Sequence, residues 1–62
     1  MMEYLTPEDI ASMLKISYEK ALDFIKFSEV NYVKVGRQYR VEEKALLNFL
    51  NKYGQYGIRI NP

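Results

Sequence analysis

Apolar residues recur at spacings of three and four in three separate stretches of the chain. Such spacing places apolar side chains on one face of a helix, so the pattern predicts three amphipathic helices packed around one core. Leu22 is an exception, because it falls on the polar face of the second helix and is expected to point outward. The predicted buried faces are Ile10, Met13 and Leu14, then Ala21, Phe24 and Ile25, then Leu46, Phe49, Leu50 and Tyr53.

Polar residues set the bounds of the first two predicted helices. Thr6 suits the N-cap, and Pro7 suits the first helical position because its missing N–H costs no hydrogen bond there. We predict this helix over residues 7–14. A tight turn follows, and Ser17 then caps a second helix, which we predict over residues 18–27.

The third helix is predicted over residues 42–52. Glu42 and Glu43 lie in its first turn and Lys52 in its last, which is the favourable sense for the helix dipole. Gly54 suits the C-cap. The remaining residues form either a short extended segment or a tail that folds back or meets a partner. Their apolar members alternate at Tyr56, Ile58 and Ile60.

β-Branched and aromatic residues fill positions 32–35 and 38–41, with Gly36-Arg37 between them, which predicts a β-hairpin. Two registers are open. A two-residue type II′ loop pairs Val35 with Gln38 and suits the glycine at the first loop position. A three-residue loop separates apolar from charged residues, and we favour it because facing pattern usually sets register. It puts Val33, Val35, Tyr39 and Val41 on one face and Lys34 with Arg40 on the other.

Composition narrows the possible functions. Hydrophobic residues make up 48% and charged residues 27% of the 62 residues, which is typical of one small globular domain. Cysteine and histidine are absent, so disulfides, the usual zinc ligands and the usual general base are all missing. The acidic pairs Glu8-Asp9 and Glu42-Glu43 lie at helix starts, which the helix dipole explains. We therefore expect no catalytic site, no metal and no cofactor.

The net charge of +1 is unevenly distributed along the chain. The first half is acidic overall and the second half basic, with three cations and no acid between Lys34 and Arg40. No apolar run approaches the ~20 residues that a membrane helix needs, and the first residues lack the pattern of a signal peptide. A cytoplasmic protein without membrane contact is therefore expected.

Two short helices joined by a tight turn, a hairpin with a basic tip and a closing helix give the layout of a small α+β winged helix-turn-helix domain. The residues themselves resemble the excisionase-type, MerR-like DNA-binding domains. The most specific segment is Val33–Val41, with its Gly-Arg tip and Tyr-Arg pair. Tyr4–Ala11, Leu14–Ser17 and Leu46–Leu50 match the opening, the turn and the closing helix of that family. We predict a domain over residues 1–53 and a tail over 54–62.

The resemblance implies a sequence-specific double-stranded DNA-binding protein. It would be an excisionase-like recombination directionality factor, which binds near an attachment site and promotes excision of a mobile element with an integrase. The alternative is a small phage- or plasmid-type transcriptional regulator on the same fold. A third reading is an interaction module that has lost DNA affinity. The implied partners are DNA, an integrase or a second copy on adjacent sites, in a bacterial or phage-encoded, nucleoid-associated protein.

The candidate DNA contacts lie on the second helix and on the wing. The start of the helix would enter the major groove, where Glu19 accepts from cytosine and Lys20 reaches guanine or phosphate. Arg37, at the loop tip, would reach the minor groove or the backbone. The full set of candidate residues is Ser17, Tyr18, Glu19, Lys20, Lys26, Lys34, Arg37, Gln38 and Arg40.

Overall fold

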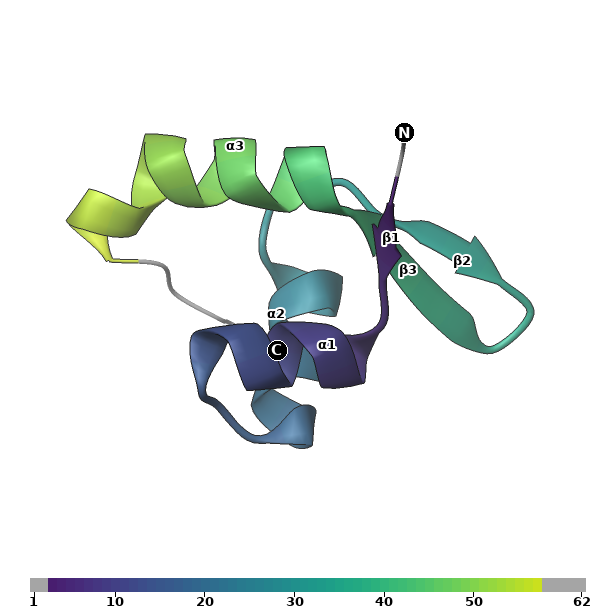
Figure 1. Ribbon diagram of the computed structural model, residues 1–62. Helices are drawn as coiled ribbons and strands as arrows, with labels where there is room; N and C mark the ends of the chain where they lie inside the picture. Colours follow the sequence, from purple (N-terminus) through teal and green to yellow (C-terminus); the bar gives the residue numbers. More distant parts are fainter. Residues whose placement is uncertain (1–2, 58–62) are drawn as a thin grey trace.

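The structure is a computed structural model that describes residues 3–57 (Figure 1). A long helix lies on one side of the body, two shorter helices lie on the other side, and a hairpin projects from one end (Figure 1). This is the predicted α+β winged helix-turn-helix layout. In chain order the elements are β1 (Tyr4–Leu5), α1 (Pro7–Leu14), α2 (Tyr18–Phe27), β2 (Val33–Val35), β3 (Gln38–Glu42), α3 (Glu43–Tyr53) and the 3₁₀ helix η1 (Gly54–Tyr56).

The bounds of α1 and α2 confirm the prediction. Each helix begins directly after a residue whose side chain caps it. The Thr6 hydroxyl accepts a 3.0 Å hydrogen bond from the Asp9 amide, and the Thr6 amide donates back to the Asp9 carboxylate at 3.0 Å. This reciprocal pair is a capping box. Ser17 caps α2 by accepting a 3.1 Å bond from the Lys20 amide. Local side-chain chemistry therefore fixes both helix starts.

The turn between α1 and α2 depends on Lys15. This residue takes φ 56° and ψ 48°, the left-handed conformation, and it is the one non-glycine residue with positive φ among those described. The conformation costs an ordinary residue about 1–2 kcal/mol. It lets the Ile16 amide donate to the Ala11 carbonyl at 2.9 Å and directs the chain into α2. The turn is therefore tight but strained.

The three strands form one antiparallel sheet in the order β1-β3-β2. The sequence did not predict β1, which pairs Leu5 with Val41 of the central strand. We call the β2–β3 hairpin, residues 33–42, the wing. The predicted third helix starts one residue later than expected, because Glu42 still has extended backbone and belongs to β3.

The favoured register of the wing is wrong. Val35 pairs with Gln38 and Val33 with Arg40, so the loop has two residues rather than three. Gly36 takes φ 62°, and Arg37 does not have positive φ. A type II′ turn requires positive φ at its first loop residue alone, so the loop fits this turn. The positive φ that glycine adopts without strain therefore outweighs the separation of apolar from charged side chains.

The register decides which wing residues share a face. Cross-strand partners lie on the same face, so Lys34 lies with Tyr39, and the alternation along β3 places Val41 there as well. Val41 is fully buried, so this face is directed toward the core. The Lys34 Nζ atom lies 5.2 Å from the centroid of the Tyr39 ring. The opposite face carries Val33 and Val35 and is exposed.

One apolar cluster joins β1, β3 and the three α-helices, and it contains most of the predicted buried residues. The Phe49 ring of α3 packs edge-on against the Phe24 ring of α2, with centroids 5.7 Å apart. It also packs at a tilt against the Tyr53 ring, with centroids 4.9 Å apart. Leu22 does not point freely outward, because it is half-buried. Met13, predicted to be buried, is exposed. The fully formed core consists of Leu5, Ile10, Ala21, Phe24, Ile25, Val30, Val41 and Leu46, with Ala11, Leu14, Ile16, Tyr39, Phe49 and Leu50 packed against it.

The chain after α3 continues in helical backbone. Gly54 is the C-cap of α3, as predicted, and its backbone is right-handed. Residues 54–56 form η1 instead of an extended segment. Among the described residues after α3, positive φ first occurs at Gly57, at 82°. The predicted alternation at Ile58 and Ile60 lies outside the described residues. Within residues 3–57, no helix is both long enough and apolar enough to cross a membrane.

We predict that Phe49→Ala destabilises the domain by about 3 kcal/mol, because it empties the site against Phe24 and Tyr53. Urea unfolding followed by circular dichroism measures the change. Leu47→Ala is the matched control on the same helix, since Leu47 is 50% exposed, and its effect should stay within about 0.5 kcal/mol. Equal stability of the two variants would contradict the assignment of Phe49 to the core.

We also predict that Lys15→Gly stabilises the domain by about 0.5–1 kcal/mol. Glycine relieves the left-handed strain, and the greater entropy of the unfolded chain offsets part of the gain. Thermal unfolding of the two proteins measures the difference. Lys15→Ala separates backbone from side-chain effects, because alanine keeps the Cβ atom and its strain. If Ala stabilises as much as Gly, the left-handed backbone is not the cause.

Candidate nucleic-acid interface

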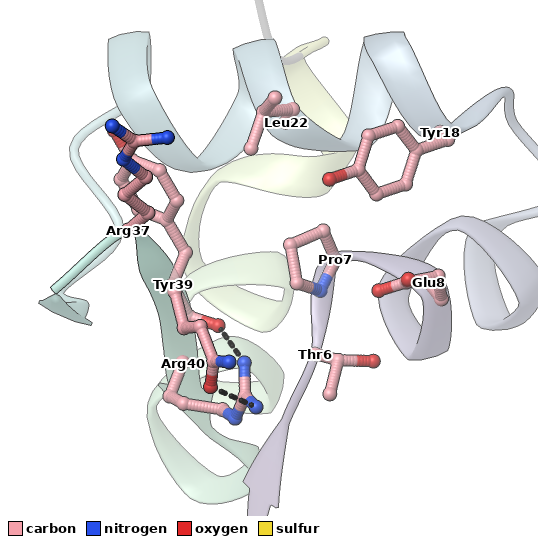
Figure 2. Close-up of a pocket in the computed structure, with 9 residues that line it drawn as sticks. Thr6, Pro7, Glu8, Tyr18, Leu22, Arg37, Tyr39 and Arg40 are labelled. Atoms are coloured by element: carbon pink, nitrogen blue, oxygen red, sulfur yellow. Dashed lines mark hydrogen bonds between the residues drawn. The ribbon is translucent and has the colours of Figure 1, made fainter. Parts of the chain in front are cut away.

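A groove of about 300 Å³ lies where the start of α1, the first turns of α2 and strand β3 meet (Figure 2). It brings together four of the predicted contact residues, which come from two different elements. Tyr18 belongs to α2, whereas Arg37, Gln38 and Arg40 belong to the wing. The complete lining consists of Thr6, Pro7, Glu8, Tyr18, Leu22, Arg37, Gln38, Tyr39 and Arg40.

Arg40 is held in place by two hydrogen bonds. Its Nη1 donates to the Tyr39 carbonyl at 2.7 Å, and its Nη2 donates to the Gln38 side-chain oxygen at 3.0 Å. Both acceptors are neutral, so the positive charge of the guanidinium is not cancelled by them. A guanidinium has five N–H donors. Arg40 therefore retains both charge and donors for an anion that enters the groove.

Arg37 lies at the tip of the wing and is exposed. Figure 2 shows its guanidinium at the end of the groove where Leu22 lies, and the Arg40 guanidinium at the end where Thr6 lies. Two cations therefore border the groove, one at each of these two ends. Glu8 lines the groove as well, in the first turn of α1, where the helix dipole favours an acid. The groove is consequently cationic along the wing and acidic at α1.

Tyr18 is 48% exposed, so it is not a core residue. Its ring lies over the groove from the first turn of α2, with the phenolic oxygen directed toward the space between Leu22 and Pro7 (Figure 2). A phenolic hydroxyl both donates and accepts hydrogen bonds. Tyr18 therefore offers a polar group beside an apolar wall.

The other candidates on α2 lie outside the groove. Ser17 is occupied as the N-cap, with its oxygen accepting from the Lys20 amide at 3.1 Å. Glu19 and Lys20 are exposed at the start of α2. Lys26 is exposed in the last turn, about 12 Å along the helix axis from Tyr18. These positions form the free surface of the helix rather than the groove.

Lys34 is separated from the other wing cations. It lies on the core-directed face above the Tyr39 ring, whereas Arg40 lies on the opposite face beside Gln38. The sequence had grouped Lys34 with Arg40 through the three-residue register. The corrected register shows that these two side chains do not act from one face.

Sequence reasoning missed several residues that build the groove. Capping accounts for Thr6, Pro7 and Glu8 in the sequence, and helical spacing places Leu22 on the outer face, yet all four line the groove. Tyr39 was noted only as part of the wing pattern. Among residues 3–57, no cluster of three or more His, Cys, Asp or Glu side chains could hold a metal ion.

Comparison with known protein families gives one result. A family model described as a helix-turn-helix domain matches residues 4–54, which is most of the chain. No curated protein and no solved structure matches the chain. The match includes α1, the turn at Lys15, α2, the wing and α3.

We predict that Arg37→Ala weakens binding to any duplex DNA and lowers the slope of log affinity against log salt by about one. The reason is that Arg37 is an exposed cation at the wing tip, where it would neutralise one phosphate. Fluorescence anisotropy on a random duplex at two or more salt concentrations measures both quantities. Unchanged affinity and slope would remove the wing tip from the interface.

Proposed function

The chain belongs to the helix-turn-helix domain family, and on that premise we propose that it acts as an excisionase-like protein that binds DNA through α2 and the wing together. A helix-turn-helix protein binds DNA in a sequence-specific manner. The proposal adds the route of binding and its purpose. It assigns α2 to the major groove and the wing to the adjacent minor groove or backbone.

The exposed residues at the start of α2 support its assignment to the major groove. The helix has ten residues, and its first turn exposes Tyr18, Glu19 and Lys20. The major groove is about 12 Å wide and admits an α-helix, and a recognition helix contacts bases with its N-terminal residues. Glu19 would accept from a cytosine amino group, and Lys20 would reach guanine or a phosphate.

The wing residues support a contact beside the helix. Arg37 is exposed at the tip of a two-residue loop, where its guanidinium would reach a phosphate beside the minor groove. Gln38 and Arg40 lie next to it along β3, where the Gln38 side chain holds the guanidinium. These residues would contact phosphates that flank the minor groove.

The observation that carries the proposal is the shared groove. Tyr18 of α2 lines the same space as Arg37 and Arg40 of the wing. A duplex that received α2 would therefore bring its backbone to the wing without rearrangement of the domain. Two contact elements on one rigid core suit an architectural DNA-binding protein, which acts by shaping DNA and recruiting others.

The excisionase role rests on the resemblance of Val33–Val41 and on this geometry. We propose that the protein binds beside an attachment site and directs an integrase toward excision of a mobile element. An integrase, or a second copy on an adjacent site, is the proposed protein partner. Residues 54–62, which we propose to lie outside the DNA-binding domain, are the segment proposed to meet it.

Binding-site selection followed by an excision assay tests the role. We expect the selected sequence to lie beside an attachment site of the element that encodes the protein. Added protein should raise excision by the integrase of that element. Arg37→Ala should lower both binding and excision, whereas Leu47→Ala should retain both. Binding at a promoter, with altered transcription and unchanged excision, would establish the transcriptional regulator instead.

A further inference from the structure

The face of the wing that points away from the core carries two exposed valines. Val35 is 68% exposed and Val33 is 49% exposed. Both belong to β2, the strand at the edge of the sheet, so no further strand of the described chain pairs with its outer side. An exposed edge strand that also carries exposed apolar side chains on its face is a liability for a protein in water. They therefore call for a reason beyond strand formation.

The register places these valines directly beside polar contact residues. Val35 pairs with Gln38, and Val33 pairs with Arg40, and cross-strand partners share a face. The hydrogen bond from Arg40 to Gln38 holds the guanidinium along β3. On the outer face, the two valines of β2 thus form one row, and Gln38 and Arg40 of β3 form the neighbouring row.

The charges on this part of the wing favour DNA over a second copy of the chain. Arg37 and Arg40 are the cations beside the two valines, whereas Lys34 lies on the opposite face, and residues 33–41 include no acid. If two copies met through this face, their Arg37 and Arg40 side chains would approach one another and repel. Glu42 lies on the same face, but at the end of β3 remote from the tip. The surface complementary to these arginines and valines is that of a polyanion that also offers apolar groups.

We propose that Val35, with Val33 behind it, makes an apolar contact with the deoxyribose walls of the minor groove. Arg37 and Arg40 then lie at the flanking phosphates. Minor-groove proteins use apolar side chains in this way beside arginine and lysine. The inference rests on the proposed function and specifies the chemistry of its wing contact. The valines supply a part of the affinity that does not depend on salt, whereas the arginines supply the part that does.

Val35→Thr tests the proposal on the full chain. Threonine keeps the branched shape and the strand preference but replaces one methyl group by a hydroxyl. We expect binding to a random duplex to weaken by about three- to tenfold with an unchanged salt slope. Arg37→Ala is the contrasting variant, because it should lower the slope. Leu47→Ala removes an exposed apolar side chain from α3, outside the wing, and should bind as the wild type does.

Three other results have distinct meanings. If the wild type binds duplex DNA and Val35→Thr binds equally well, the valine contact is wrong and the proposed function stands. If the wild type binds no duplex at low salt, the proposed function itself fails. Sedimentation of the free proteins tests whether the valines meet a second copy instead. A wild-type dimer that Val35→Thr dissociates would show that they do, and this would also overturn the proposal.

Discussion

The burial of Val41 is the interaction on which the rest of the structure depends. Its side chain is fully buried, its backbone pairs with Leu5 of β1, and α3 begins two residues later. The central strand β3 therefore joins the wing, the N-terminal strand and the closing helix at one point. A chain of 62 residues without cysteine has no disulfide to replace this junction. The groove along β3 keeps its shape because Val41 anchors the strand to the core.

Local chemistry explains what the sequence could predict about the fold. Thr6, Pro7 and Ser17 act within a few residues of their own positions, so the bounds of α1 and α2 followed from the chain alone. The pairing of Leu5 with Val41 joins segments that are far apart in the sequence, and β1 was missed for that reason. The wing register was misjudged because two physical preferences conflicted, and the backbone conformation of Gly36 prevailed.

The structure brings some of the candidate contact residues together and separates others. Tyr18, Arg37, Gln38 and Arg40 line one groove, and no pattern in the chain indicated that α1 forms its third wall. Lys34 was assigned to the wrong face because its position depended on the register. Strand faces are sensitive to a shift of a single residue, whereas helix faces tolerate small errors in their bounds. This difference explains why α2 was described well and the wing was not.

The two-residue loop at Gly36-Arg37 lowers the entropy cost of ordering the wing on binding. A longer and looser tip would have to be ordered when it met its ligand, and each immobilised flexible side chain costs about 0.5–1.5 kcal/mol. Here the backbone around Arg37 is already fixed by paired residues on both sides, Val35 and Gln38. The guanidinium of Arg40 is also tethered before any ligand arrives. The wing backbone is thus preorganised, so little of it would have to be ordered on meeting a ligand.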